Sequence, residues 1–219
     1  MQSAARNRIL FEGFLKFLIL VLEMKENIDI FKIKSNNIPP QKGRILIAEP
    51  FLHGDYFSRS VVFLVAYSEK GAVGFILNKK IEYQLHDVFP DFPEFKGNIF
   101  IGGPVSADSI FYVHKLGGKL PGSINVLGDL YWGGDFEVLK NLITVGAVNT
   151  EDIHFFLGYS GWDAGQLEDE IKEDSWLVTD VDENLIMQEA NNSSWADFVK
   201  KAGNRYSIWE NYPENPSFN

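Results

Sequence analysis

Residues 60–78 read SVVFLVAYSEKGAVGFILN, and this stretch gives the clearest indication of how the chain folds. Ser60–Tyr67 and Ala72–Leu77 are rich in β-branched and aromatic residues, as buried strands are. Ser68–Gly71 between them holds polar residues and a glycine, as a loop does. The pattern predicts a β-hairpin with a four-residue loop, whose two strands are buried on both faces.

Further strands are predicted on both sides of this hairpin, because short apolar runs recur there between Gly, Pro or Ser residues. Arg44–Ala48 precedes the hairpin and stops at Pro50. Four more runs follow it, namely Ile99–Ile101, Ile110–His114, Ile124–Leu127 and Ile153–Leu157. Together these segments predict a sheet of about seven strands.

Three helices are predicted in the C-terminal half of the chain. Asp135 is a suitable N-cap for the first, in which apolar residues recur every three or four positions. Asp163, with Gln166 three residues later, fits a capping box for the second, so that Leu157 would be followed by a glycine turn and a capped helix. The third covers about residues 194–202 and ends at Gly203.

Hairpins and single crossovers are mixed along the chain, which predicts an α/β class. The expected fold is a single domain with a mixed, strongly twisted sheet, open or partly closed, flanked by helices. We expect the domain to cover residues 42–205, preceded by an extension and lead-in at 1–41 and followed by a C-terminal tail at 206–219.

The extension contains one apolar run, Ile9–Leu22, which charged residues interrupt. It is shorter than the stretch of about 20 apolar residues that a membrane-spanning helix needs, so we expect no membrane span. Met24 opens a polar, ordinary N-terminus, and residues 1–23 are therefore expected to precede the native start.

Charge and composition exclude several classes of function. Twenty Lys and Arg against thirty Asp and Glu give a net charge of −10, so the chain as a whole would repel a phosphate backbone. There is no cysteine, hence no disulfide and no thiol nucleophile. His53, His86, His114 and His154 lack metal-binding spacing. We expect no metal, no other cofactor and no direct nucleic-acid binding.

Three glycine- or loop-bearing strand ends are the candidate ligand sites. Glycines at a strand end let a ligand or another segment approach the backbone, and an Arg clamps a carboxylate or fixes a loop. Each candidate thus has a structural interpretation as well, as a tight turn, a loop anchor or a packed indole. The candidate ligand-binding residues are Arg59, Ser60, Asn78, Gly102, Gly103, Pro104, Tyr159, Ser160, Gly161, Trp162 and Gln166.

Two functions remain open on these residues. The first is a non-enzymatic module whose glycine-lined groove receives a small anionic ligand or a partner peptide. The alternative is a hydrolase or transferase in which His114 is the general base and Ser60 or Ser160 supplies the hydroxyl. Backbone N–H groups near Gly102 and Gly103 would then form an oxyanion site.

The chain from about Arg44 to Gly203 resembles the bacterial YqgE/AlgH family. The matching pieces are ILIAEP at 45–50, DYFSRSVVFLV at 55–65, GAVGFILN at 71–78, IGGPV at 101–105, the pair Val113-His114 and LGYSGWDAGQLEDEI at 157–171.

This resemblance implies an α/β fold with a mixed sheet and a cytosolic bacterial protein, and it brings the label transcriptional regulator. The sequence has no helix-turn-helix pattern and no basic helix to enter a DNA groove. A regulator this acidic is expected to act through a small ligand or a protein partner, as a monomer or a homo-oligomer.

Overall fold

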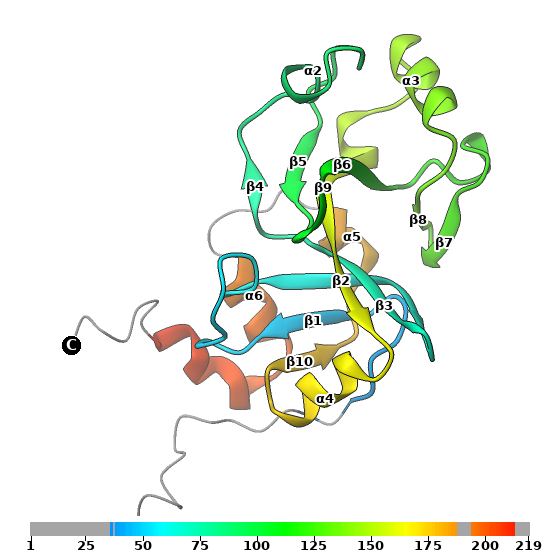
Figure 1. The fold of residues 1–219 in the computed structure, drawn as a ribbon. Helices are drawn as coiled ribbons and strands as arrows, with labels where there is room; N and C mark the ends of the chain where they lie inside the picture. The colour runs from blue at the N-terminus through cyan, green and yellow to red at the C-terminus, as the bar shows by residue number, and fades with distance from the viewer. Residues whose placement is uncertain (1–35, 37, 188–193, 213–219) are drawn as a thin grey trace, which may run out of the picture. The chain divides into compact units, whose positions relative to one another are not determined.

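The structure is a computed structural model that describes residues 36, 38–187 and 194–212. These residues belong to one compact unit that starts at Ser35. The fold class is α/β, as predicted, with a large sheet and helices outside it (Figure 1). The expectations about Ile9–Leu22 and Met24 lie outside the described residues. Within the described ranges, no helix is long and apolar enough to cross a membrane.

The elements follow one another in the order typical of a mixed α/β chain. The strands are β1 (Ile45–Ala48), β2 (Val61–Ser68), β3 (Gly71–Ile76), β4 (Lys80–Ile81), β5 (Asn98–Ile101), β6 (Val105–His114), β7 (Ile124–Leu127), β8 (Leu130–Trp132), β9 (Ile153–Asp163) and β10 (Trp176–Thr179). The helices are α2 (Leu85–Val88), α3 (Phe136–Thr144), α4 (Gln166–Lys172), α5 (Glu183–Met187) and α6 (Ser194–Lys201), with short 3-10 helices η1 (Gly117–Lys119), η2 (Thr150–Asp152) and η3 (Asn204–Asn211).

The strands form a mixed sheet in the order β10-β1-β2-β3-β9-β6-β8-β7. Strand β5 lies off this path and pairs with β9 in parallel, and β4 pairs with β5. The other ladders among the described residues are antiparallel. The outermost strands β10 and β7 do not pair with each other, so the sheet stays open and does not close into a barrel.

The central hairpin is formed by β2 and β3, as the sequence predicts. Its loop is shorter than predicted, because Ser68 and Gly71 pair across the strands and only two residues connect them. Gly71 has a φ of 127°, which a glycine adopts without strain. A Cβ there would lie 2.1 Å from the carbonyl oxygen of Trp162, so this glycine also lets β9 approach the hairpin.

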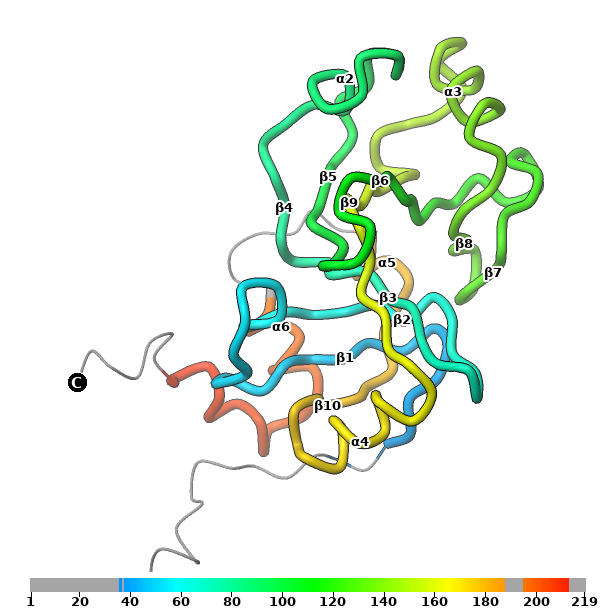
Figure 2. The backbone as a smooth tube through the Cα atoms, in the orientation of Figure 1, coloured from blue at the N-terminus to red at the C-terminus, as the bar shows by residue number. Residues whose placement is uncertain are grey.

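Strand β9 is the element that the sequence predicted least well. We expected it to end at Leu157 and a glycine turn to follow, but the strand continues to Asp163. Its first half pairs with β5 and β6, and its second half pairs with β3. Figure 2 shows β9 in yellow as one continuous run leading to α4. The reason is Gly158, whose φ of 67° bends the strand without ending it.

The start of α4 also differs from the prediction that Asp163 caps it. Asp163 pairs with Gly71 in the β3–β9 ladder, and the N-cap is Gly165, with a φ of 79°. Half of the expected capping box forms, since the Asp163 backbone N–H donates to Gln166 Oε1 at 3.0 Å. Asp163 is thus part of the β3–β9 ladder, although the local sequence predicts it as the N-cap of α4.

The other two predicted helices are confirmed. The Asp135 side chain caps α3 by accepting a hydrogen bond from the Val138 backbone N–H at 3.0 Å. Leu139 and Ile143 of α3 are buried, as the apolar stripe indicates. Helix α6 ends at Lys201, shortly before Gly203, which has a φ of 125°.

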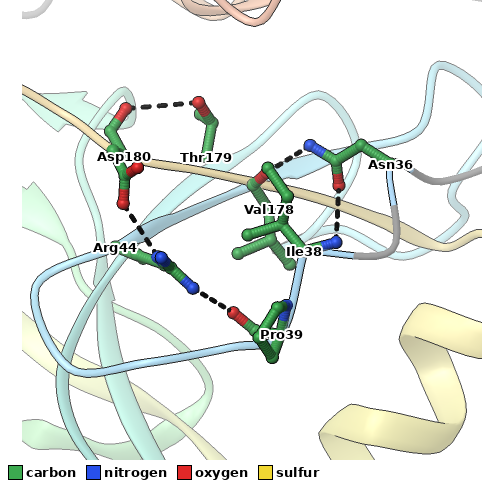
Figure 3. A network of polar contacts seen from close by, with 7 residues as sticks. All are labelled: Asn36, Ile38, Pro39, Arg44, Val178, Thr179 and Asp180. Carbon is green, nitrogen blue, oxygen red and sulfur yellow. Dashed lines mark hydrogen bonds and ion pairs between the residues drawn. The ribbon is translucent and has the colours of Figure 1, made fainter.

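Both ends of the described chain extend the folded part beyond the expected residues 42–205. The lead-in is attached to β10 (Figure 3), where Asn36 Nδ2 donates to the Val178 carbonyl at 2.5 Å. Arg44 connects the same lead-in to Asp180. Its Nη1 donates to the Pro39 carbonyl at 2.7 Å, and its Nε lies 2.8 Å from Asp180 Oδ1. At the other end, η3 buries Tyr206 and Trp209, so residues that we expected in the tail are packed.

Two clusters of buried side chains among the described residues include side chains of β9. One is formed by α3 with β5, β6 and β9 and includes Leu139 and Phe155. The other is formed by β1, β2, β3, β10 and α4 and includes Leu46, Trp162 and Trp176. Because β9 contributes side chains to both clusters, it links them.

Candidate functional site

The glycine segments that we expected to line a groove pack directly against the backbone of β9. Gly102 N–H donates to the Leu157 carbonyl at 2.8 Å, and the Gly102 carbonyl accepts from Ser160 Oγ at 3.0 Å. A Cβ on Gly103 would lie 2.3 Å from the carbonyl carbon of Tyr159. These glycines therefore let two strands approach each other, and the N–H of Gly102 is not available to an oxyanion.

The other members of this segment are placed around β9. Pro104 is exposed, and Gly161 is half-buried. Tyr159 is half-buried and packs edge-on against Phe111, with ring centroids 5.5 Å apart. Residues 102–105 and 158–161 are thus in direct contact, whereas we expected segments 57–60, 102–105 and 158–166 to line an open groove.

Arg59 and Asn78 fix the start of β2. Asn78 Oδ1 accepts from the Val61 N–H at 2.9 Å, and its Nδ2 donates to the Arg59 carbonyl at 2.8 Å. This holds Arg59 at a φ of 47°, which is uncommon for a residue other than glycine. The Arg59 guanidinium lies 4.8 Å from the Trp195 ring centroid and donates to the Tyr212 carbonyl. Arg59 therefore fastens the C-terminal segment to the domain.

His114 is buried and its hydrogen bonds leave it no role as a base. Nδ1 accepts from the Leu116 N–H at 3.1 Å, which assigns the ring proton to Nε2. Nε2 then donates to the Gly133 carbonyl at 2.9 Å. Ser123 Oγ lies 3.2 Å from Nε2 but gives its own proton to the Leu120 carbonyl at 2.7 Å. Burial lowers the pKa of His114, so the ring stays neutral near pH 7.

The expected partners of His114 are not brought to it. His114 pairs with Ile153 at one end of the β6–β9 ladder, and Ser160 lies seven residues further along β9, which corresponds to about 23 Å of strand. Ser60 is fully buried before β2, and its Oγ has no hydrogen-bond partner among the described residues. The arrangement that a hydrolase or transferase needs is therefore not assembled from these three side chains.

Trp162 and Gln166 are joined by Glu170, which the sequence analysis did not single out. The indole Nε1 groups of Trp162 and Trp176 donate to Glu170 Oε2 at 2.8 and 2.7 Å. Gln166 Nε2 donates to the other carboxylate oxygen at 2.9 Å. This carboxylate fastens α4 to the core, and two buried indoles have their polar groups satisfied by it.

Replacement of this carboxylate is expected to destabilise the fold. Glu170→Ala leaves two indole N–H groups without their acceptor, at a cost of about 2 kcal/mol in the free energy of unfolding. Urea unfolding at neutral pH measures this value. Asp169→Ala is the control, because Asp169 is exposed and forms an ion pair with the exposed Lys172 at 2.7 Å. Equal midpoints for the two variants would contradict the role of Glu170.

A pocket opens where the chain after β8 turns away from β6. The two strands pair only at Val113 with Trp132 and at His114 with Tyr131. Gly133 and Gly134 follow, with φ values of 70° and 114° that direct the chain outward. The resulting pocket, which we call the fork pocket, has a volume of about 350 Å³ and is lined by Ile110, Phe111, Tyr112, Gly133, Gly134 and Phe136.

The fork pocket has a fixed wall. The Tyr112 hydroxyl donates to the Gly134 carbonyl at 2.7 Å. Burial, together with the nearby Asp135, raises the pKa of Tyr112 to about 12, so the hydroxyl remains a donor across the physiological range. His114 Nε2 donates to the carbonyl of the adjacent Gly133 at 2.9 Å. The backbone that lines the pocket is thus pinned at two successive residues.

A second pocket adjoins the first across the ring of Phe136. It has a volume of about 290 Å³, we call it the loop pocket, and it is lined by Val88, Phe89, Pro90, Asp91, Phe92, Phe136 and Lys140. The Phe136 ring lies 5.7 Å from Phe92 and 6.3 Å from Tyr112, between centroids. Lys140 Nζ lies 6.0 Å from the Phe136 centroid and 3.4 Å from Glu137 Oε1.

The sequence analysis missed both pockets. The signals for them are the Phe- and Pro-rich run at residues 89–95 and the Gly133-Gly134 pair directly after a strand. Among the residues that the structure describes, no group of three His, Asp or Glu side chains is placed to hold a metal ion. The linings of these two pockets are mostly apolar and aromatic.

Comparison with known proteins shows which family this chain belongs to. The model of the AlgH-like family (DUF179) matches residues 45–207. The chain belongs to the AlgH-like family. This confirms the resemblance drawn from the sequence motifs, and the match includes both pockets and β9 of this AlgH-like domain.

Relatives of this AlgH-like chain match it along nearly their full length. A UPF0301 protein of Bacteroides fragilis is 41% identical over 197 residues, covering 90% of this chain and 100% of the relative. A UPF0301 protein of Parabacteroides distasonis is 43% identical over 193 residues, covering 87% and 98%.

Solved structures agree with the fold. The solution structure of the AlgH protein from Pseudomonas aeruginosa has a TM-score of 0.64 and 28% identity, covering 83% of this chain and 98% of that one. The crystal structure of a Corynebacterium diphtheriae protein has a TM-score of 0.63 at 22% identity, covering 82% and 95%. The latter bears on the fold alone.

Proposed function

We propose that this AlgH-like domain is a non-enzymatic regulatory module that binds an extended segment of a partner protein at the fork pocket. The observation that carries the proposal is the fork itself, an apolar pocket beside a strand edge, with a second apolar pocket directly across Phe136. Extended peptides are recognised in this way, by backbone pairing at a strand edge and by pockets for alternate side chains.

The charges around the pockets favour a peptide over a small anion. In the two linings together, the one cationic side chain is Lys140, and it is paired with Glu137 at 3.4 Å. Asp91 lies in the same lining as Lys140. An anionic ligand would therefore lose its hydration without gaining an unpaired cation, whereas apolar side chains are desolvated favourably there.

Regulation through DNA contact is not part of the proposal. The net charge of −10 opposes binding to a phosphate backbone. His114 and Ser160 form hydrogen bonds with nearby backbone groups. The alternative of an enzyme at the glycine segments therefore loses the side chains on which it depended. A peptide-binding role instead uses the fork pocket and the loop pocket, which the fold leaves open.

The proposal is tested with a library of displayed random peptides, selected on the full chain. Gly133→Asn places a side chain in open space at the fork, because a Cβ there meets nothing within 4 Å. Asn tolerates the φ of 70° at that position. The selected peptides are expected to bind this variant at least about tenfold more weakly than the parent chain in fluorescence anisotropy.

Gly146→Asn is the matched control for this experiment. Gly146 has a φ of 71°, also lies in open space, and is not part of either pocket lining. Both substitutions carry the same backbone cost, so both proteins should melt at the same temperature. Peptides that bind the two variants equally well, or a library that yields no binders, would reject the fork as the binding site.

A further inference from the structure

We infer that the segment bound at the fork is a short basic strand, in which Lys or Arg residues alternate with apolar ones and whose backbone pairs with β6 at Ile110. This inference rests on the proposed function and adds the chemistry of the partner. Three features of the described residues support it, namely the free edge of β6, the bulge that limits this edge, and the charges around the fork.

The edge of β6 presents backbone groups toward the fork. The Tyr112 carbonyl accepts from the Gly133 N–H at 3.1 Å, so the backbone of Tyr112 faces the β8 side. Along a strand, backbone groups alternate in direction, and Ile110 therefore faces the same side as Tyr112. Strand β8 pairs with β6 only from Val113 onward. In the described chain, no strand pairs with Ile110 on the fork side, and the fork pocket lies at this position.

A bulge restricts this edge to a short partner segment. Between Val105 and Ile110 the register of β6 against β9 shifts, and Ser106 has a φ of 50°. Bulges of this kind interrupt an edge and prevent long edge-to-edge pairing. A second copy of this chain would need a longer regular edge to form a continuous sheet, so the geometry favours a short segment of another protein.

The alternation of side chains along the added strand follows from the geometry of the fork. In a β-strand, successive side chains point to opposite faces of the sheet. One face at Ile110 holds the aromatic lining with Phe136, which suits an apolar residue. The residues before and after it point away from this lining, toward solvent and the charged groups around the fork.

The charges around the fork are mostly negative. The exposed carboxylates on the segments that line the two pockets, or directly beside them, include Asp87, Asp91, Asp108, Asp135 and Glu137. Lys140 is the one cation in the two linings, and Glu137 pairs with it. Asp108 lies on β6 itself, two positions before Ile110. Opposite charge on the partner raises its association rate and affinity, and like charge lowers them.

The test uses the displayed peptide library on the full chain, with two charge variants of equal net charge. The rim variant carries Asp91→Asn, Asp108→Asn and Asp135→Asn, and Asn still caps α3 in place of Asp135. The control variant carries Glu69→Gln, Asp163→Asn and Glu173→Gln, which are exposed and outside both linings.

Peptides selected on the parent chain are expected to be enriched in Lys and Arg on both sides of an apolar residue. They should bind the rim variant about tenfold more weakly and the control variant within about twofold of the parent. Raising the salt concentration should remove most of the difference between the two variants, because exposed charges are screened. The Ile110 amide proton should exchange more slowly with solvent when peptide is bound.

The outcomes separate the inference from the proposed function. Peptides that lose binding to Gly133→Asn but carry no basic bias, or that bind both charge variants equally, overturn the basic partner and leave the fork as a binding site. Unchanged exchange of the Ile110 amide with bound peptide overturns the strand pairing. Peptides that bind Gly133→Asn as well as the parent overturn both.

Discussion

Gly103→Ala is expected to lower the free energy of unfolding by about 3–5 kcal/mol, the largest effect among the substitutions considered. A Cβ at this position would lie 2.3 Å from the carbonyl carbon of Tyr159 and 2.4 Å from the backbone nitrogen of Ser160. These are backbone atoms of a central strand, so neither can move aside as a flexible side chain would. The φ of 153° adds strain for any residue with a Cβ.

Urea unfolding followed by circular dichroism measures this loss. Gly118→Ala is the control, since its Cβ would meet nothing within 4 Å and the change should stay within about 0.5 kcal/mol. A Gly103→Ala protein as stable as the parent would mean that β9 does not pack closely against this glycine. The strand end at Gly102 would then again be a candidate ligand site.

Acid is expected to destabilise the protein through His154. Its side chain is buried in β9, with the ring centroid 5.1 Å from that of Phe100. Burial, and then the nearby Lys80, lower the pKa of His154 to about 4, against which a backbone hydrogen bond with Met187 acts only in part. In the unfolded chain the pKa returns to about 6.5.

The direction of this pH effect on the free energy of unfolding depends on which state binds the proton. Between these two pKa values the unfolded chain binds the proton and the folded chain does not, so the stability contribution is complete above about pH 6.5 and is lost as the pH falls toward 4. The full loss is about 3 kcal/mol, at 1.36 kcal/mol per unit of pKa difference. The lowered pKa of His114 acts in the same direction.

Unfolding free energies at about pH 7.5 and pH 4.5 test this expectation. In His154→Leu the drop should be smaller than in the parent by about 2–3 kcal/mol, since Leu cannot be protonated. His53→Gln removes an exposed histidine and should leave the drop as it is in the parent. The same pH dependence in His154→Leu and in the parent would show that His154 does not carry the effect.

The elements that local sequence determines were predicted correctly, except that the hairpin loop has two residues instead of four. The hairpin of β2 and β3 has its apolar content concentrated in two runs, and a polar pair with a glycine separates them. Helix α3 follows an N-cap residue and shows a regular apolar stripe, and α6 is followed by a glycine. In each case, the residues that define the element are close together in the chain.

The parts that depend on distant residues were not predicted. Strand β10 lies within an acid-rich stretch, and it is a strand because it pairs with β1, more than a hundred residues earlier. Asp163 looks like a helix cap until its pairing with Gly71 is known. Glu170 looks like a solvent-exposed charge until two indoles are placed beside it.

In the candidate site, too, features set by nearby residues were predicted and features set by distant residues were not. The individual glycines, Arg59 and His114 were recognised as special, and each does have an unusual backbone or burial. Their roles are to hold segments together, which depends on partners that the sequence does not reveal. The fork pocket forms from β6, the chain after β8 and α3, so only the assembled sheet shows it.

The position of β9 in the sheet has a consequence for biosynthesis. Strand β9 pairs with β3, β5 and β6 but is made after all of them, and its last residue follows the end of β3 by roughly 90 residues. At a translation rate of about 5–20 residues per second, β3 leaves the ribosome several seconds before its neighbour exists. Nascent chains that stop short of Asp163 therefore carry unpaired hydrophobic strand edges. These edges can be covered by β9 only after about three-quarters of the chain has been translated.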